Sequence, residues 1–225
     1  MAAGLKKRSI ETFKYRGYFL VSMQKQSSSR ISMIIPRKVL KDLVVAVKRG
    51  LSSYYLQEKG KQVLFINIRD VAEGRINSDN ITMAAIKETA AVARTRIEPG
   101  DVIITVKGSA FKAGVASPKE RDAVISSNLI AFKLTHEILP ELVVAYLNSP
   151  KGQQELHARS AGIAQKFLNE RSLLDISIPV PLMEKQKQLA LYLQLSKEYD
   201  LLAERERDLR KQINNFIVQN QMEVK

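Results

Sequence analysis

A chain of 225 residues with a net charge of +13 and a pI of about 9.9 can bury one sizeable hydrophobic core, but not two full domains beside a long helix. It has no cysteine, which excludes disulfides and thiolate metal sites, and no apolar run of the roughly eighteen residues that a membrane span needs. We therefore expect a soluble, cytoplasmic protein that avoids membranes and whose positive charge favours a polyanionic partner.

The positive charge is concentrated in the first quarter of the sequence. Residues 1–60 hold 13 Lys and Arg against 3 Asp and Glu, whereas residues 61–182 hold 15 against 13 and residues 183–225 hold 8 against 7. A basic segment that only keeps the protein soluble is the alternative to one that attracts nucleic acid. This uneven distribution of charge favours a nucleic-acid partner.

Periodicity divides the chain into three parts. Residues 1–30 show neither a helical nor a strand period, so we expect a basic N-terminal extension there. The pattern then predicts a globular domain over residues 31–180 and one long helix over residues 181–225.

The globular part begins with a stretch that has helical spacing. Apolar residues follow Pro36 at these intervals up to Arg49, and Gly50 interrupts them, which predicts a short helix with a glycine stop. The residues that carry this spacing are Val39, Leu40, Leu43, Val44 and Val47.

Strands are predicted next, and helices return after them. Residues 63–68, 101–106 and 128–134 are apolar, partly β-branched runs near glycines or turn residues, which is typical of buried strands. Residues 142–147 share one helical face, and Ser149-Pro150 forms a cap and first-turn pair for another helix, with Gly162 as its stop. Strands before helices predict an α+β fold with a mostly non-local sheet.

Motifs for catalysis are missing from the sequence. The two histidines, His136 and His157, do not have metal-ligand spacing, and there is no glycine-rich phosphate loop or dinucleotide fingerprint. We expect no catalytic residue, no metal site and no cofactor, so the chain by itself is not an enzyme.

Three loops instead carry groups that suit nucleic acid. Guanidinium, hydroxyl, phenol and ammonium groups bind phosphates and base edges, and small residues let backbone amides approach a phosphate closely. Each group alone is weak evidence, because a basic loop residue is often simply solvated, but three such loops in one basic domain support each other. The candidate residues are Arg49, Ser52, Ser53, Tyr54 and Tyr55 in the first loop, Arg94 and Arg96 in the second, and Lys107, Ser109 and Lys112 in the third.

The C-terminal helix has an unbroken seam in which steps of three and four residues alternate. This spacing keeps the a and d positions of a coiled coil facing a partner helix, so the seam predicts dimerisation. Its members are Tyr192, Leu195, Tyr199, Leu202, Glu206, Leu209, Ile213, Phe216 and Asn220. Glu206, a charge in the middle of the seam, costs stability unless Arg205 or Arg207 of the partner helix neutralises it. Packing of the helix on its own domain is the alternative.

Several passages, taken in order, resemble the specificity subunits of type I restriction-modification enzymes, or more strictly one half of such a subunit. They include Pro-Gly-Asp at 99–101, Tyr-Leu-Asn-Ser-Pro at 146–150 and Ile-Pro-Val-Pro-Leu at 178–182, together with residues 40–50, 63–74 and 126–129. The likeness covers roughly residues 35–220. Two departures are the single copy of domain and helix, where the family has two of each, and the basic residues 1–30, which have no counterpart in the family. A milder change is the Pro-Val-Pro-Leu sequence in place of Pro-x-Pro-Pro.

The resemblance implies a non-catalytic target recognition domain that reads one half of a split site in double-stranded DNA. It also implies a helix that docks a DNA methyltransferase subunit, and a restriction subunit beyond it. The single copy suggests a homodimer through the helix, in which an antiparallel pair would restore two heads. A helix that binds only the methyltransferase subunit is the alternative to this pairing. A coiled-coil protein that binds nucleic acid without sequence choice, in a regulatory or structural role, is the alternative.

Overall fold

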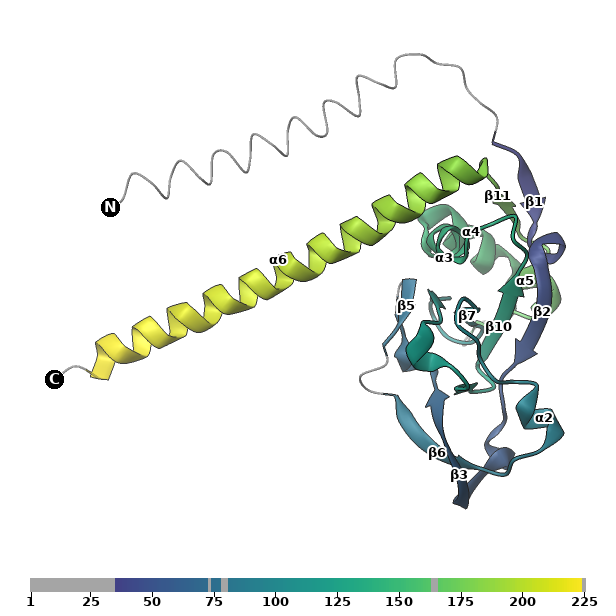
Figure 1. Ribbon diagram of the computed structural model, residues 1–225, viewed down its shortest axis with the longest axis horizontal. Helices are drawn as coiled ribbons and strands as arrows, with labels where there is room; N and C mark the ends of the chain where they lie inside the picture. Colours follow the sequence, from purple (N-terminus) through teal and green to yellow (C-terminus); the bar gives the residue numbers. More distant parts are fainter. Residues whose placement is uncertain (1–34, 73, 78–80, 163–165, 224–225) are drawn as a thin grey trace, which may run out of the picture. The chain divides into compact units, whose positions relative to one another are not determined.

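The computed structural model describes residues 35–72, 74–77, 81–162 and 166–223 (Figure 1). The account below concerns the unit Pro36–Lys225. The extension predicted for residues 1–30 lies outside the described residues.

Two sheets and one pair of short strands form the head, which we define as residues 36–182. The strand order is β2-β10-β7-β8-β5-β4 in the large mixed sheet and β6-β3-β9 in the small one, and β1 pairs with β11. The strands are β1 (Arg37–Val39), β2 (Val44–Arg49), β3 (Leu56–Ile66), β4 (Val71–Ala72), β5 (Gly74–Ile76), β6 (Thr82–Ile86), β7 (Val102–Thr105), β8 (Ala113–Val115), β9 (Val124–Ile125), β10 (Leu129–Leu134) and β11 (Ser177–Pro179).

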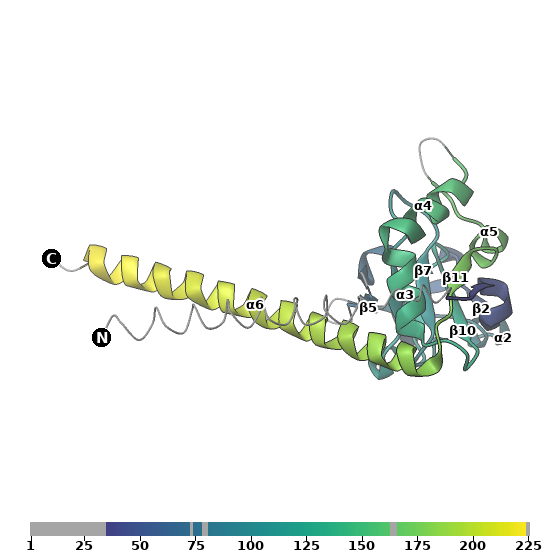
Figure 2. The same cartoon turned by 90° about the horizontal axis from the view of Figure 1, so that it is seen from above.

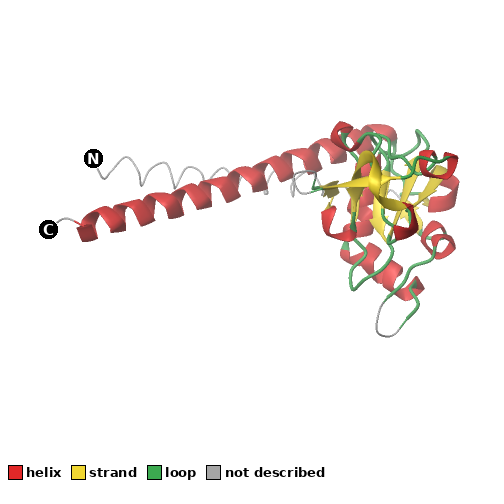
Figure 3. Ribbon diagram, turned by 90° about the horizontal axis from the view of Figure 1, so that it is seen from below, coloured by secondary structure: helices red, strands yellow, loops and turns green. Residues whose placement is uncertain are grey.

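Short helices connect these strands and pack around them, mostly outside the sheets (Figure 3). They are the 3-10 turns η2 (Leu40–Leu43), η3 (Ser53–Tyr55), η4 (Ile68–Asp70) and η6 (Pro118–Glu120), and the α-helices α2 (Ala90–Ala93), α3 (Pro140–Asn148), α4 (Pro150–Arg159) and α5 (Glu170–Leu174). The predicted cap is confirmed, because Ser149 Oγ accepts a hydrogen bond of 3.1 Å from Gly152 N at the start of α4. The helix ends at Arg159, before the glycine that we expected to stop it.

The three predicted strands correspond to β3, β7 and β10, and the α+β class is confirmed. The sheet is also non-local, since β2 pairs with β10 and β10 with β7, both antiparallel. The prediction for the first strand was too short at its start, because β3 begins at Leu56. It was too long at its end, where Ile68 already belongs to η4.

The helix predicted over residues 36–49 was wrong. This stretch forms β1, the 3-10 turn η2 and β2. The turn buries Leu40 and Leu43 completely, and the β-branched residues after it extend along β10, with Val47 opposite Phe132. Helical spacing was satisfied by coincidence, because a buried turn followed by a β-branched strand can produce the same intervals.

The head has its own hydrophobic core. The largest cluster joins α3, α4 and α5 to the large sheet and includes Phe111, Phe132 and Leu147, all fully buried. Two smaller clusters lie around β9, one of them against the small sheet. Each sheet is therefore held by packing on apolar side chains from other elements of the head.

The long helix α6 (Met183–Glu223) has 41 residues and spans about 62 Å at ~1.5 Å per residue. Its first turns are fixed to the head by Gln186, which is buried. The side-chain amide of Gln186 donates to the carbonyl oxygens of Glu137 (2.8 Å) and Pro181 (2.9 Å), and its oxygen accepts from Leu139 N (2.9 Å). Further along α6, Lys197 Nζ still donates to Gly74 O of the head at 3.3 Å, and the rest of the helix extends away from the head, as Figure 2 shows. We call α6 the arm.

The arm is too polar to cross a bilayer despite its length. In the described ranges, none of the helices combines the length and the hydropathy of a membrane span.

Candidate nucleic-acid interface

At one end of its strands, the large sheet brings together chain segments that are distant in sequence. The end of β2 lies beside the start of β10, which lies beside the end of β7. Backbone hydrogen bonds continue this order beyond the strands: Gly50 N to Leu129 O (3.3 Å), Ser127 N to Leu51 O (2.8 Å), Val106 N to Asn128 O (2.9 Å) and Gly108 N to Lys166 O (3.1 Å). We call residues 49–55, 105–112, 126–128 and 166–168 the loop rim.

Two glycines shape the loop rim, Gly50 by permitting a close backbone approach and Gly108 by permitting a positive φ. A Cβ atom on Gly50 would lie 1.8 Å from the carbonyl oxygen of Ser126, so only glycine fits there. Gly108 has a φ of 126°, which L-residues with side chains rarely adopt. Gly50 follows Arg49 and Gly108 follows Lys107, two residues that we predicted from the sequence to contact nucleic acid.

The first predicted loop presents an aromatic side chain to solvent. Tyr54 is 85 % exposed and meets the ring of Tyr55 edge-on at 5.4 Å, while Tyr55 packs against the cluster of the small sheet. Ser52 is exposed in the same loop; Ser53 lies in η3, and its side chain is outside the described part. Tyr54 therefore contacts Tyr55 on one side, and most of its side chain is exposed to solvent.

The third predicted loop supplies uncompensated positive charge to the loop rim. Lys112 and Ser109 are exposed and Lys107 is half-buried. The turn that carries them is closed by Thr105, whose Oγ1 accepts from Lys112 N at 2.9 Å and donates to Ala110 O at 3.1 Å. Within the residues that the structure describes, neither lysine forms an ion pair. Their ammonium groups are therefore free to meet an anion.

Arg49 is at the loop rim but already has a partner. Its Nε lies 2.6 Å from Oε2 of Glu170 at the start of α5. This hydrogen bond, together with the charge of Glu170, raises the pKa of Arg49 above its usual value. The guanidinium keeps further N–H donors that point to solvent, so a phosphate contact would have to share it with Glu170.

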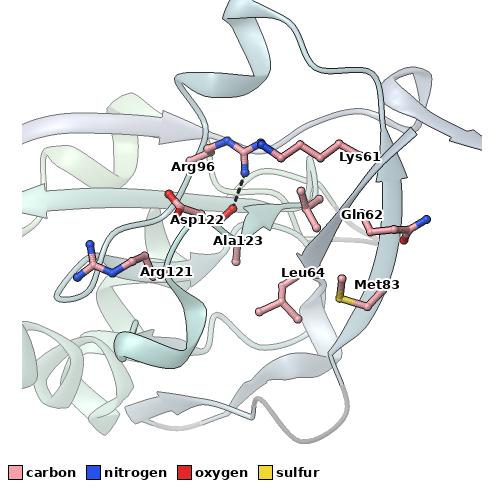
Figure 4. A pocket seen from close by; sticks show the side chains of 9 residues that line it. Lys61, Gln62, Leu64, Met83, Arg96, Arg121, Asp122 and Ala123 are labelled. Atoms are coloured by element: carbon pink, nitrogen blue, oxygen red, sulfur yellow. Dashed lines mark hydrogen bonds between the residues drawn. The ribbon is translucent and has the colours of Figure 1, made fainter. Parts of the chain in front are cut away.

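The second predicted loop lies away from the loop rim, beside the small sheet. Arg94 is exposed at the end of α2. Arg96 is largely covered: its Nη2 lies 2.6 Å from Oε2 of Glu88, and its Nη1 donates to Asp122 O over 2.8 Å. Figure 4 shows Arg96 and Lys61 in the cavity of about 410 Å³ at this place, with Arg121 at its margin. The predicted set thus divides between two regions of the head.

Sequence reasoning missed a groove between the small sheet and the loop rim. Its volume is about 560 Å³. The groove is lined by Leu56, Phe65, Asn67, Ile68, Arg69, Thr82, Ala84 and Asn128. Nothing in the sequence brings together residues from four separate segments, so only the fold could reveal it.

The seam of the arm is exposed along its whole described length. The exposed fraction lies between 50 and 67 % for each apolar seam residue, namely Tyr192, Leu195, Tyr199, Leu202, Leu209, Ile213 and Phe216. The head does not cover these side chains, so packing of the seam on its own domain, the alternative stated above, does not occur in this structure. An exposed apolar stripe of this length is typical of a surface that pairs with another helix.

Glu206 has a partner on its own helix. Arg210 Nη2 lies 2.6 Å from Glu206 Oε1, one helical turn further on. The charge in the seam is therefore balanced within one chain, and an arginine of a partner helix is not required.

The described residues hold no cluster of three or more metal-ligating side chains. His157 packs against the ring of Phe111, with 5.1 Å between the ring centroids, and His136 is exposed. The two histidines have different surroundings and share no site.

Comparison with known proteins gives one relative by sequence. No family model matches the chain. The specificity subunit of the type I restriction enzyme EcoBI from Escherichia coli is 21% identical over 127 residues, which cover 55% of this chain and 26% of that subunit.

Solved structures share the fold. One, described as the structural basis of complex assembly and conformational transition of the type I R-M system, has a TM-score of 0.55 at 18% identity and is matched by 92% of this chain over 54% of its own length. The HsdS subunit from Thermoanaerobacter tengcongensis has a TM-score of 0.56 at 15% identity, with coverage of 90% and 50%. The S subunit from M. genitalium has a TM-score of 0.50 at 15% identity, with coverage of 75% and 41%. The chain has the fold of type I specificity subunits and spans about half or less of each relative.

Proposed function

We propose that this chain is a DNA sequence-recognition component of a type I restriction-modification-like system. The head binds one half of a bipartite site in double-stranded DNA, and the arm pairs with the same helix of a second copy. The observation that carries this proposal is the combination, in one chain of this fold, of a basic loop rim on the head and an uncovered apolar seam on the arm.

The loop rim has the chemistry that a recognition surface for DNA needs. Lys107 and Lys112 supply charge for phosphates, which gives affinity and orientation but no sequence information. Hydroxyl, phenol and amide groups lie beside them on the same rim and can meet base edges. Loops held on a sheet in this way present such groups at fixed positions.

Pairing of two arms would join two heads in one dimer. Two heads on an antiparallel pair of arms about 62 Å long would be separated by up to ~18 base pairs at about 3.4 Å per pair. Such a pair would read a split, symmetric site. Chemistry then belongs to a methyltransferase subunit, with a restriction subunit beyond it, that docks on the paired arms.

Binding of the full chain to duplex DNA at several salt concentrations tests the proposal. We expect affinity to fall steeply with salt and one sequence to bind at least ~10³-fold more tightly than random duplex at physiological salt. Lys107→Gln and Lys112→Gln should each reduce the slope of log affinity against log salt by about 0.9, because each removes one phosphate contact. Lys119→Gln, an exposed lysine of η6 outside the loop rim, is the matched control and should leave the slope unchanged.

A ratio of specific to random affinity near one would contradict sequence recognition and leave only binding without sequence choice. Partner dependence is checked separately: with a methyltransferase from the same host, one sequence should become protected by methylation. Methylation by the isolated chain would overturn the non-catalytic assignment.

A further inference from the structure

The groove beside the loop rim is formed by one face of the small sheet, η4 and the turn that precedes β10. Phe65 and Thr82 lie opposite each other on β3 and β6 and share this face. Leu64 and Met83 alternate with them and point to the other face, where Figure 4 shows them in the cavity that holds Lys61. The groove is open, and its polar groups come from different elements.

Arg69 is held in a fixed orientation at the edge of this groove. Its Nη2 donates to Thr82 Oγ1 over 2.6 Å, and its Nε lies 3.6 Å from Asp70 Oδ1. Asp70 is buried and is itself fixed, because its Oδ2 accepts from Asn67 N at 2.8 Å. The side chain of Arg69 is nevertheless 70 % exposed, so the remaining N–H groups of its guanidinium face solvent.

This arrangement suits a base edge better than a phosphate. The nearby carboxylate of Asp70 already compensates the charge of Arg69, which lowers the gain from a phosphate, whereas the free N–H donors are unaffected. A planar guanidinium with a fixed plane matches the O6 and N7 acceptors of guanine. Lys107 and Lys112, by contrast, lack a carboxylate partner in the described part of the chain and suit phosphates.

Asn128 supplies the second polar group. Its backbone oxygen is used by Val106, which fixes the turn, and the residue is half-buried. Its side-chain amide forms no hydrogen bond with any other residue that the structure describes. Asn67, which also lines the groove, is engaged instead, since its side-chain amide donates to Phe65 O at 3.3 Å. An amide with a free donor and a free acceptor matches N6 and N7 of adenine.

We infer that Arg69 and Asn128 are specificity-determining residues that read a guanine and an adenine from the major groove, within the half-site bound by this head. Phe65, Ile68 and Ala84 form the apolar wall of the same groove, which suits the methyl group of the thymine paired with that adenine. The inference rests on the proposed DNA recognition and assigns the base-reading part of it.

The test is selection of binding sites from a random duplex library by the full chain, for the parent and for the variants Arg69→Lys, Arg69→Gln and Asn128→Ala. We expect each variant to lose preference at one base pair, by about 5- to 150-fold, while the rest of the site is still selected. Guanine should be the base affected by the Arg69 variants and adenine the base affected by Asn128→Ala. Arg69→Lys keeps the charge and loses the planar fork, so it should relax the same position as Arg69→Gln.

Arg159→Gln, which removes an exposed arginine of α4 outside the groove, is the charge control and should retain the full preference. A uniform loss of affinity for all sequences in the Arg69 variants would assign Arg69 to phosphate binding and overturn the inference. Unchanged selection by all three variants would also overturn it while the proposed function stands. If the parent itself selects no sequence, the proposed function fails and the inference with it.

Discussion

Large apolar side chains are buried in the head but exposed in the seam of the arm. In the head, Phe111, Phe132 and Leu147 are fully buried among elements of the same chain. In the arm, the leucines and aromatic residues of the seam are at least half exposed. Because burial of apolar surface is the main favourable term in folding, the head can be stable alone. The arm, by contrast, gains the same stabilisation only from a second helix.

A charge in the seam tests most directly whether a second helix stabilises the arm. Leu202→Asp removes about 1.5–3 kcal/mol of leucine burial per copy, hence about 3–6 kcal/mol for the pair, which raises the dissociation constant of the dimer ~10²- to 10⁴-fold. Sedimentation velocity at micromolar concentration measures the change from dimer to monomer.

The neighbouring leucine provides the matched control for that experiment. Leu201→Asp changes a leucine outside the seam that is 47 % exposed, against 67 % for Leu202, so the dimer should persist. A parent that sediments as a monomer at micromolar concentration, or equal effects of the two substitutions, would contradict pairing through the seam.

The core of the head should respond to truncation much more than the arm does. Phe132→Ala leaves a cavity in a fully buried site and should lower the free energy of unfolding by about 3–5 kcal/mol. Phe216→Ala, the same change at an exposed seam position, should leave the stability of the monomeric head unaltered. Calorimetry of both variants in the Leu202→Asp background separates folding from pairing.

The junction between the two regions should be affected locally, at the backbone groups that Gln186 satisfies. Gln186→Leu removes an amide that satisfies two carbonyl groups and one N–H of the head, and leaving buried polar groups unpaired costs about 1–3 kcal/mol for each. Faster hydrogen exchange of the Leu139 amide would report the loss. Gln188→Leu, an exposed position on the same helix, should not change that exchange rate.

The smallest effect is expected at the surface of the head, around Glu98. The hydrogen bond from Lys133, and then the charge of Lys48, lower the pKa of Glu98. A lowered folded-state pKa means that the stabilisation is complete above the unfolded value of about 4.3 and is lost as pH falls through the folded value. The stability difference between the parent and Glu98→Gln should therefore shrink below about pH 4, and Lys133→Gln should weaken this dependence.

The seam and the strands show what local pattern alone can predict. A 4-3 repeat over Tyr192 to Phe216 requires only the geometry of one helix, so its face could be predicted without any tertiary contact. The same is true of β7 and β10, where continuous apolar runs indicate burial. Residues 36–49 failed because the same intervals fit a helix and a turn followed by a strand, and the pairing with β10 decided between them.

For the interface, the sequence by itself determined which chemical groups were present: lysines, arginines, tyrosines and hydroxyl-bearing residues in predicted loops, and no metal-binding spacing. Tertiary structure decided which of them meet. It brought the first and third predicted loops together at the strand ends of the large sheet. It also paired Arg96 with Glu88 beside the small sheet, and it placed Arg69 and Asn128 in one groove. The physical reason is that helix periodicity and loop chemistry are local properties of a chain. The neighbours of a sheet edge depend on strand order and register, which are fixed only when distant segments pack together.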